Sequence, residues 1–315
     1  MSRIAFVFPG QGSQSVGMGK DFYEAPAARR IYDVFNGLVA PNLSEVCFNG
    51  PDEELRRTLY TQPAILATSI AALELFQEQC QIQPALAAGH SLGEYGALYA
   101  AGVISLETAA QLVKRRSELM EAAPSGAMAA VLGLDGQTVE TLVDTYRKEY
   151  NRTLTVANYN MDNQVVISGD PVAVDEIAAT LKAAGAKRVM PLPVGGAFHS
   201  PLMNVAAEEF TVFLQGFEFN APRFPVVTNV DALLTSDASG MRGKLGRQID
   251  SSVRWTQTMD RMIRQERIDT VIEFGPGKVL TGMFKKMFPD VRLYNVFDGA
   301  SLETTVAELK QAVVV

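Results

Sequence analysis

The sequence predicts an α/β protein: a mostly parallel sheet covered by helices, with a smaller unit inserted into it. Three observations lead to this fold class. Short apolar segments alternate with helical patterns through both outer parts of the chain, which is typical of a parallel sheet with helices on its faces. The middle part follows the order β-α-β-β-α-β. One apolar segment ends directly in a Gly-x-Ser-x-Gly motif that a helical pattern follows.

The composition is ordinary for a soluble protein, and the length suits one large domain or one domain carrying a second. The chain has 315 residues, of which 47% are hydrophobic and 20% charged, enough for a sizeable core. A net charge of −7 without a basic stripe argues against nucleic-acid binding. No apolar run reaches the length expected for a membrane span, and there is no signal-peptide pattern. The two cysteines, Cys47 and Cys80, have no metal-ligand spacing, so we expect a cytoplasmic protein without a bound metal.

The outer elements alternate between strands and helices. The expected strands cover Ile4 to Phe8, 85–89, Pro225 to Val230 and Thr270 to Phe274, with one more near the C-terminus. The expected helices cover 21–39, 52–59, Pro63 to Gln79, 92–101, 105–122, 201–216, 241–249 and 255–266, with two more at the end. These elements form the predicted core, residues 1–124 and 198–315.

The inserted unit is predicted to occupy residues 125–197. Its strands are expected at 126–133, 154–160, 164–170 and 187–194, with helices at 135–150 and 171–185. This order is the signature of a ferredoxin-like fold.

The motif Gly89-His90-Ser91-Leu92-Gly93 predicts a nucleophile elbow, a tight strand-to-helix turn that exposes a serine hydroxyl. The alternative is an ordinary glycine-rich turn, but the flanking strand and helix favour the elbow. The amide of Leu92 would then face a developing oxyanion. A loop at 9–14, rich in glycine, is expected to supply a second amide. A phosphate-binding loop is excluded there because Met18 stands where its lysine should be.

An activated serine needs a base, and the chain has two histidines. His90 adjoins the serine on the turn, so its side chain is expected to point away and to be structural. His199, in the loop that re-enters the core, is therefore the candidate base. Spacing singles out no aspartate as a third member, which leaves an amide or a main-chain carbonyl to orient the imidazole.

Arg116 falls on the inward stripe of the helix at 105–122, which Ser105 can cap. A buried arginine is costly without an anionic partner. Two interpretations stay open on the helix alone. Arg116 forms a structural ion pair or extends to the surface, or it receives the anion of a substrate.

Seven motifs occur in order along nearly the whole chain: Phe8-Pro9-Gly10-Gln11-Gly12-Ser13-Gln14, Thr61-Gln62-Pro63-Ala64, Gly89-His90-Ser91-Leu92-Gly93-Glu94, Arg116, Asn158 with Gln164-Val165-Val166-Ile167-Ser168-Gly169, Ala197-Phe198-His199-Ser200-Pro201, and Phe274-Gly275-Pro276-Gly277-Lys278. Together they resemble the malonyl-CoA:acyl carrier protein transacylase family. The family fold, an α/β-hydrolase-like core with an inserted ferredoxin-like subdomain, agrees with the predicted order of elements.

The resemblance implies a ping-pong acyl transfer from malonyl-CoA to the phosphopantetheine thiol of an acyl carrier protein, for fatty-acid or polyketide synthesis. It implies no cofactor of the enzyme's own, and we expect a monomer. The residues that it implicates are Ser91 as nucleophile, His199 as base, the amides of Gln11 and Leu92 as oxyanion donors, the main chain of Gln248 as partner of the histidine, Arg116 for the malonyl carboxylate, Phe198 for malonyl selectivity, and Gln62 and Met120 for the pocket wall.

Three alternatives stay open. The same Ser-His site would serve an acyl-thioester hydrolase, and a related enzyme could act in trans on a polyketide assembly line. A protein that only docks carrier proteins is a third class. The sequence departs from the family pattern at Asn160-Met161, where many relatives carry a proline after the asparagine.

Overall fold

The computed structural model describes residues 2–313, whose strands form two separate sheets. The strands of the larger sheet are β1 (Ile4–Phe8), β2 (Leu86–Gly89), β7 (Val226–Val227), β8 (Leu234–Thr235), β9 (Thr270–Phe274) and β10 (Arg292–Val296). They lie in the order β10-β9-β1-β2-β7-β8, and every neighbouring pair is parallel except β7 and β8. The predicted α/β class with a mostly parallel sheet is confirmed.

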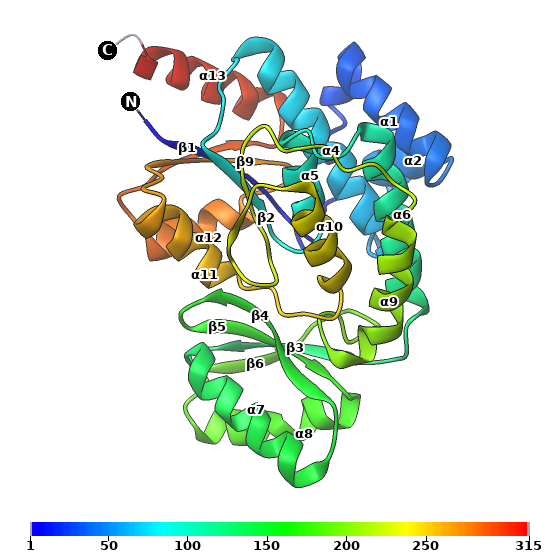
Figure 1. Cartoon of the computed structure of the whole chain (residues 1–315), viewed down its shortest axis with the longest axis vertical. Helices are drawn as coiled ribbons and strands as arrows, with labels where there is room; N and C mark the ends of the chain where they lie inside the picture. Colours follow the sequence, from blue (N-terminus) through cyan, green and yellow to red (C-terminus); the bar gives the residue numbers. More distant parts are fainter. Residues whose placement is uncertain (1, 314–315) are drawn as a thin grey trace.

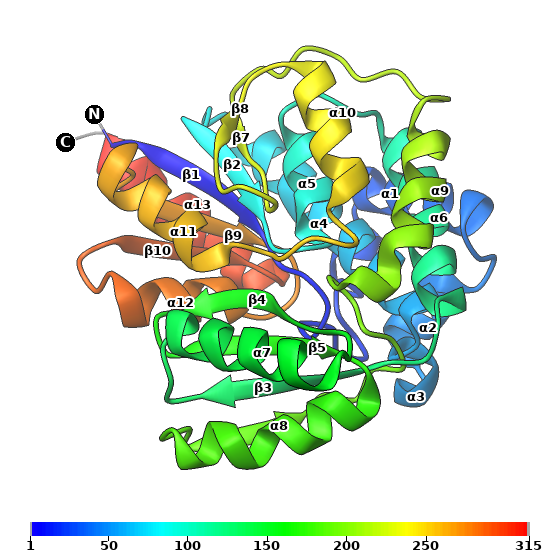
Figure 2. The same cartoon turned by 60° about the horizontal axis from the view of Figure 1, so that its bottom comes forward.

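Helices cover both faces of this sheet, because side chains alternate between the two sides of each strand. On β1, Phe6 and Phe8 belong to the core cluster formed with α1, α4, α5 and α6, whereas Ala5 and Val7 belong to the cluster formed with α11 and α12. The helices of the core are α1 (Pro26–Leu38), α2 (Leu43–Asn49), α3 (Asp52–Leu55), α4 (Thr58–Gln79), α5 (Gly93–Ala100), α6 (Leu106–Ala122), α9 (Asn204–Leu214), α10 (Ala238–Arg247), α11 (Trp255–Asp260), α12 (Val279–Met287) and α13 (Gly299–Val313). Figure 2 shows α4 and α5 on the opposite side of the sheet from α11 and α12.

Helix α4 corrects the expectation that no stretch is long and apolar enough to cross a membrane. Its 22 residues meet that test by length and composition alone. In the structure, however, 83% of the apolar window is buried inside the protein, as expected of a central core helix. The length of α4 therefore reflects its central place in the core, where it packs on α1 and α6.

The smaller unit is a four-stranded antiparallel sheet with two helices. Its elements are β3 (Ala127–Leu132), α7 (Gly136–Tyr150), β4 (Leu154–Met161), β5 (Gln164–Gly169), α8 (Pro171–Ala183) and β6 (Arg188–Pro191). The sheet order is β6-β3-β5-β4, in which the fourth strand lies beside the first and the third beside the second. This is the arrangement expected of the ferredoxin-like fold. All these elements lie inside the predicted interval 125–197, whose limits as a domain stay a prediction.

The small sheet lies between its own helices and the core. Ala129 and Val131 of β3 pack with α7 and α8, whereas Met128 and Ala130 belong to the main core cluster. In Figure 1 the small unit lies below the core, with α7 and α8 on its outer side. The alternation along β3 thus places one face of the small sheet against the core.

One backbone bridge closes the small unit at its base, and another joins it to the core. The segments that enter and leave it lie side by side, since Ser125 and Gly196 form an antiparallel bridge. The edge strand β4 also pairs with a core segment at Val253. The amide of Tyr159 donates to the carbonyl of Val253 at 2.9 Å, and the amide of Val253 donates to the carbonyl of Ala157 at 2.8 Å. These contacts hold the strand that carries Asn158 over the carboxyl ends of β1 and β2.

Several expected boundaries are wrong. The helix expected at 21–39 is a 3-10 turn (Phe22–Glu24) followed by α1, and the helix expected at 52–59 is the single turn α3. Helix α4 begins at Thr58, so Pro63 lies in its second turn rather than at its start. There the proline costs one backbone hydrogen bond, which the near-complete burial of α4 outweighs.

The strand expected from Pro225 to Val230 has only two paired residues, Val226 and Val227. The next two residues bond elsewhere: the amide of Thr228 donates to Leu233 at 3.2 Å, and that of Asn229 donates to a carboxylate of the site at 3.0 Å. The expected helix 255–266 is α11 followed by a π-helical turn (Arg261–Gln265).

Candidate active site

Ser91 lies on a strained turn between β2 and α5. Its backbone angle φ is +51°, a value that residues other than glycine rarely adopt. The turn is also very tight: a Cβ on Gly89 would lie 1.9 Å from the carbonyl of Gly93, and one on Gly93 would lie 2.0 Å from the carbonyl oxygen of Phe8. Both glycines of the motif are therefore required, as the nucleophile-elbow prediction demands.

Two amide side chains from distant segments hold this turn in place. The amide of Ser91 donates to Oδ1 of Asn229 at 2.7 Å, and Nδ2 of Asn229 donates to the carbonyl of Gly89 at 2.7 Å. From the other side, Nε2 of Gln248 donates to the carbonyl of Ser91 at 2.9 Å. Because these bonds fix the backbone on both sides of the serine, they over-determine its unusual conformation.

His199 contacts the serine hydroxyl, with 2.8 Å between Nε2 and Oγ of Ser91. Its other ring nitrogen, Nδ1, lies 2.9 Å from the carbonyl of Gln248 and 3.0 Å from that of Ser251. Since a carbonyl oxygen can only accept, the proton must be on Nδ1. Nε2 therefore presents a lone pair to the hydroxyl of Ser91, as a general base requires.

The environment of His199 keeps the imidazole neutral. The side chain is 4% exposed, and burial lowers its pKa to about 3, with the positive charge of Arg116 adding to the effect. The carbonyl of Gln248 acts in the opposite direction. Among residues 2–313, the partners of Nδ1 are two main-chain carbonyls and no carboxylate, which is one of the two arrangements expected, an amide or a main-chain carbonyl.

Arg116 lies fully buried on α6, as its place on the inward stripe predicts. Its guanidinium donates to Oε1 of Gln62 at 2.6 Å, to Oγ of Ser91 at 2.9 Å and to Oε1 of Gln248 at 3.1 Å. Over residues 2–313, no acidic side chain forms an ion pair with it, and its Nε has no acceptor. Of the two interpretations, the structural ion pair is therefore wrong, because the charge faces neutral groups and the nucleophile.

The loop after β1 lies directly against the elbow. A Cβ on Gly10 would lie 2.4 Å from the carbonyl oxygen of His90, so a larger residue would push the loop away. Within the described chain, the amides of Gln11 and Leu92 donate to no backbone carbonyl. These are the two amides that the family resemblance implicates as oxyanion donors.

A cavity of about 100 Å³ brings the predicted residues together, between the core and the small unit. The serine, the histidine and the arginine all contribute to its wall. The complete lining consists of Gln11, Gln62, His90, Ser91, Arg116, Met120, Met128, Asn158, Leu192, Val194, Phe198 and His199. A second cavity of about 300 Å³ adjoins it and shares Gln11, Met120, Val194 and Phe198. All the site residues predicted by number therefore line the small cavity, apart from Leu92 and Gln248. Leu92 follows the serine on the turn, and Gln248 forms hydrogen bonds with both the serine and the histidine.

His90 has a structural place, as expected, although its ring does not point fully away from the site. Its Nε2 lies 2.8 Å from Oδ1 of Asn160 on β4, and its ring packs edge-on against Trp255. It thus joins the elbow to the small unit, and the hydroxyl of Ser91 bonds to His199 instead.

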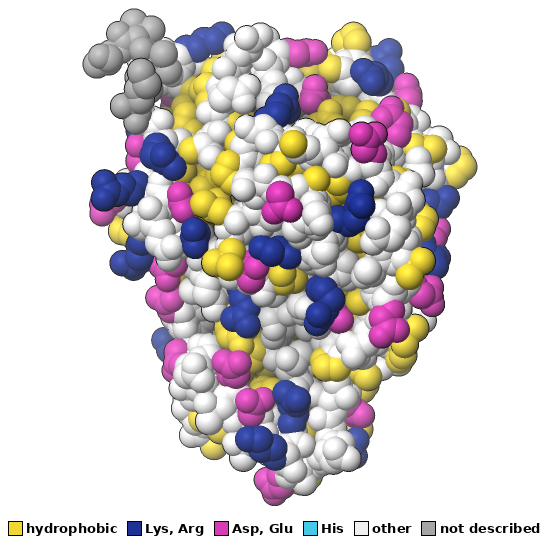
Figure 3. All heavy atoms as spheres, in the orientation of Figure 1, with side chains coloured by type: hydrophobic (Ala, Val, Ile, Leu, Met, Phe, Trp, Pro, Cys, Tyr) yellow, Lys and Arg dark blue, Asp and Glu magenta, His cyan; other side chains and the backbone are white. Residues whose placement is uncertain are grey.

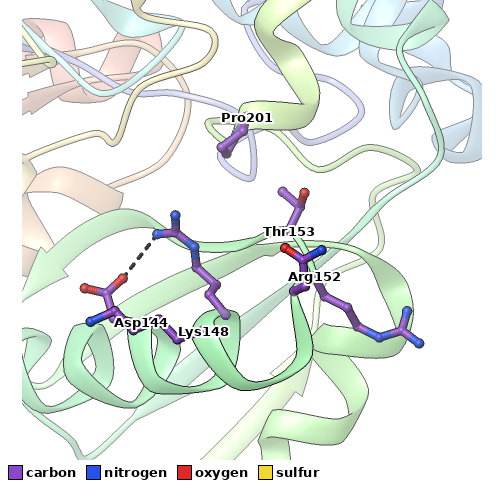
Figure 4. Close-up of a pocket in the computed structure, with 7 residues that line it drawn as sticks. Asp144, Lys148, Arg152, Thr153 and Pro201 are labelled. Carbon is purple, nitrogen blue, oxygen red and sulfur yellow. Dashed lines mark hydrogen bonds and ion pairs between the residues drawn. The ribbon is translucent and has the colours of Figure 1, made fainter.

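A larger cavity, of about 530 Å³, lies elsewhere, between the end of α7 and Pro201 (Figure 4). Its two arginines pair with acidic side chains, Arg147 with Asp144 at 3.1 Å and Arg152 with Asp170 at 3.5 Å. It holds no nucleophile with an adjacent base. On the face shown in Figure 3, basic and acidic side chains are interspersed.

Sequence reasoning missed two side chains and one carbonyl of the site: Asn229, Glu94 and the carbonyl of Ser251. Asn229 could have been suspected, since it follows β7 at the carboxyl end of the parallel sheet, where ligand sites form. The contact with Ser251 leaves no trace in the sequence, because it is made by a main-chain carbonyl that every residue type has. Glu94 belongs to a motif already noted, but only the fold reveals its partners.

An α/β fold that presents a serine on an elbow to a neutral histidine, with two unpaired amides beside it, defines a serine-dependent acyl-transfer enzyme. The comparisons agree. The acyl transferase domain family matches residues 5–313. Malonyl CoA-acyl carrier protein transacylase of Bacillus subtilis is 43% identical over 315 residues, covering 99% of this chain and 98% of the relative.

Similar agreement comes from other organisms and from solved structures. The Escherichia coli K12 enzyme of the same name is 42% identical, over 91% of this chain and 93% of the relative. An acyl carrier protein S-malonyltransferase from Vibrio cholerae superposes with a TM-score of 0.92 at 40% identity, covering 96% of this chain and all of that one. The chain belongs to the malonyl-CoA:acyl carrier protein transacylase family.

Proposed function

We propose that the protein moves a malonyl group from malonyl-CoA to the phosphopantetheine thiol of an acyl carrier protein through a malonyl-serine intermediate. The observation that carries this proposal is the position of the Ser91 hydroxyl, which lies 2.8 Å from Nε2 of His199 and 2.9 Å from the guanidinium of Arg116. One hydroxyl thus contacts both a base and a buried cation. Such a site suits an acyl group that itself carries a negative charge.

The first half-reaction forms the acyl-enzyme. Oγ of Ser91 attacks the thioester carbonyl while its proton passes to Nε2 of His199. The amides of Gln11 and Leu92 donate to the oxyanion of the tetrahedral intermediate. When the carbon–sulfur bond breaks, the sulfur of coenzyme A leaves with the proton from His199.

The second half-reaction runs in the opposite direction with another thiol. The carrier thiol gives its proton to Nε2 of His199, and its sulfur attacks the ester carbonyl. The bond to Oγ of Ser91 breaks, and that oxygen recovers the proton. The carbonyls of Gln248 and Ser251 hold Nδ1–H throughout, so the imidazole keeps its orientation as the proton moves on and off Nε2.

Arg116 would bind the malonyl carboxylate with its planar fork, which suits a carboxylate in a bidentate pair. Gln62 fixes one side of the guanidinium at 2.6 Å. Phe198 and Met120 line both the small cavity and its larger neighbour, so they would limit the size of the acyl group. A bulkier α-branched acyl group would collide with this wall.

The choice of carrier is supported by a relative. A malonyl-transacylase solved in complex with a type II polyketide acyl-carrier protein superposes with a TM-score of 0.93 at 39% identity, covering 98% of this chain. We extend the carrier substrate to this chain, in fatty-acid or polyketide synthesis. We also propose a cytoplasmic monomer that binds no cofactor, membrane or nucleic acid of its own.

The test is brief mixing of the purified protein with malonyl-CoA, followed by an acid quench and intact-protein mass spectrometry. We expect the mass of one malonyl group on the wild-type protein and none on Ser91→Ala. The acyl-enzyme should then pass the group to holo carrier protein. Steady release of CoA without any carrier would instead identify a thioester hydrolase, because water would then be the second acceptor.

A further inference from the structure

Glu94 is a buried carboxylate at the second residue of α5, three residues after the nucleophile. It is 1% exposed and accepts two hydrogen bonds at the same oxygen, Oε2: one from the amide of Asn229 at 3.0 Å and one from Nε2 of Gln248 at 2.9 Å. Within residues 2–313, no basic side chain forms an ion pair with it. A carboxylate in such a place is costly, so its presence beside the nucleophile calls for a reason.

Gln248 connects this carboxylate to all three groups of the site. Its Nε2 donates to Glu94 and also to the carbonyl of Ser91 at 2.9 Å. Its Oε1 accepts from Arg116 at 3.1 Å, and its main-chain carbonyl accepts from Nδ1 of His199 at 2.9 Å. The charge of Glu94 is therefore one residue away from the nucleophile, the base and the cation.

We propose that Glu94 is a positioning residue that acts through Gln248 as the resident counter-charge of the site, balancing Arg116 in the empty enzyme and favouring the positive charge that His199 acquires during acyl transfer. This inference rests on the proposed function. It assigns to Glu94 the electrostatic part that a third triad carboxylate plays elsewhere, without direct contact with the imidazole.

The other charges near Glu94 support this assignment. Arg116 and Glu94 act on each other electrostatically, and burial raises the pKa of Glu94 to about 7 while its hydrogen bonds to Gln248 and Asn229 oppose that rise. Tyr95 interacts with both groups. Asp231 is the other acidic neighbour, and Lys244 pairs with it at 2.8 Å, which leaves Arg116 as the buried cation near Glu94.

The two expected effects of this charge are opposite in sign for a malonyl donor. A negative charge near Arg116 weakens the attraction of the guanidinium for a second carboxylate, so it raises KM for malonyl-CoA. The same charge stabilises the imidazolium of His199, so it raises kcat. For an acetyl donor, which brings no acyl carboxylate, only the second effect applies.

The variant Glu94→Gln separates these effects. Both hydrogen bonds end on one oxygen, so the Gln amide oxygen can accept both, and the change removes little besides the charge. The assay is run near pH 8, where a carboxyl with a pKa of about 7 is mostly ionised. We expect kcat to fall about tenfold with either malonyl-CoA or acetyl-CoA, the order of magnitude expected for one charge acting across a buried amide. KM for malonyl-CoA should fall several-fold, on the order of threefold or more, while KM for acetyl-CoA stays the same.

Glu273→Gln is the matched control. Glu273 on β9 is also fully buried, but it accepts its hydrogen bonds from Leu280 and Thr281 at the start of α12 and from Asn295 on β10, all outside the cavity lining. We expect this variant to change Tm without the split between KM and kcat. If Glu94→Gln only lowers Tm, or lowers kcat without lowering KM for malonyl-CoA, Glu94 is merely structural.

Two further measurements keep the inference testable. Glu94→Asp retains the charge, so it should keep the wild-type KM for malonyl-CoA even if its hydrogen bonds weaken; a KM lowered as in Glu94→Gln would overturn the inference. Modification of Ser91 by phenylmethanesulfonyl fluoride, an uncharged reagent, depends on His199 but not on the acyl donor. It should be about tenfold slower in Glu94→Gln than in Glu273→Gln. A wild-type protein that reacts with this reagent but takes no malonyl group would refute the proposed function alone.

Discussion

Replacing Arg116 by methionine should convert a malonyl-selective site into one that treats malonyl and acetyl donors alike. Methionine keeps an unbranched apolar stem on α6 and removes the charge. The guanidinium is fully buried and bonds to three neutral groups, and no acidic side chain among residues 2–313 lies within hydrogen-bond distance of it. The carboxylate of a bound malonyl group would be the first direct anionic partner.

The size of the effect follows from that burial. Removing one partner of a buried, hydrogen-bonded charge pair costs about 3–5 kcal/mol, so kcat/KM for malonyl-CoA should fall about 10²- to 10⁴-fold. For acetyl-CoA the change should be at most about tenfold in either direction, because losing the hydrogen bond to Oγ of Ser91 opposes the gain from removing a desolvated cation. The ratio of kcat/KM for malonyl-CoA to kcat/KM for acetyl-CoA is therefore the quantity that tests the role of Arg116.

The assay is a rapid-quench measurement of Ser91 acylation with each donor, read by intact mass. Arg115→Met is the matched control, since the neighbouring side chain is 36% exposed and pairs with Glu118 and Glu209 at the surface. It should leave both rates within about twofold of the wild type. An equal loss of malonyl and acetyl transfer in Arg116→Met would refute the assigned role and point to general damage at the serine.

Two further predictions test the base and the elbow. Burial and the charge of Arg116 lower the pKa of His199 to about 3 in the empty protein, so its imidazole signals in NMR should show no titration as the pH falls from 8 to 5; a midpoint near 6.5 would contradict this environment. Because that pKa lies below the unfolded value, His199 should also reduce stability progressively as the pH falls below about 6.5. Gly93→Ala should lower the free energy of unfolding by about 3 kcal/mol or more and abolish acylation, since its Cβ would lie 2.0 Å from the carbonyl oxygen of Phe8. Gly243→Ala, in the open on α10, should instead raise stability by about 0.5–1 kcal/mol; equal denaturant midpoints for the two variants would contradict the steric argument.

The parts of the fold with strong periodicity were predictable. The strand from Thr270 to Phe274 and the helix that Ser105 caps lie where the pattern puts them, and the six elements of the small unit follow in the expected order. The core segments between 20 and 62 were less predictable. There α1, α2, α3 and the start of α4 pack against one another, and burial decides boundaries that a local pattern leaves open.

In the site, the reacting residues were predictable from the sequence, whereas the groups that hold them in place were not. A motif of five residues predicts Ser91 as the nucleophile. His199 is predicted because the chain has only two histidines, and Arg116 because it places a charge on an apolar stripe. The groups that hold them come from far along the chain: 157 residues separate Gln248 from the carbonyl of Ser91 that it binds, and 138 separate Asn229 from its amide. Local sequence spacing cannot predict such contacts, because it is the order of the strands in the sheet that brings these segments together.

The low pKa of His199 and its assignment as a base are compatible once the substrate is considered. In the empty site, burial and the charge of Arg116 both disfavour the imidazolium. A malonyl carboxylate bound to Arg116 would offset that charge, so we expect the imidazole to become more basic as the correct acyl group binds. An acetyl group brings no such anion and leaves the base weak. Arg116 would therefore select malonyl twice, once by binding its carboxylate and once through the basicity of His199, and the second selection should appear in kcat rather than in KM.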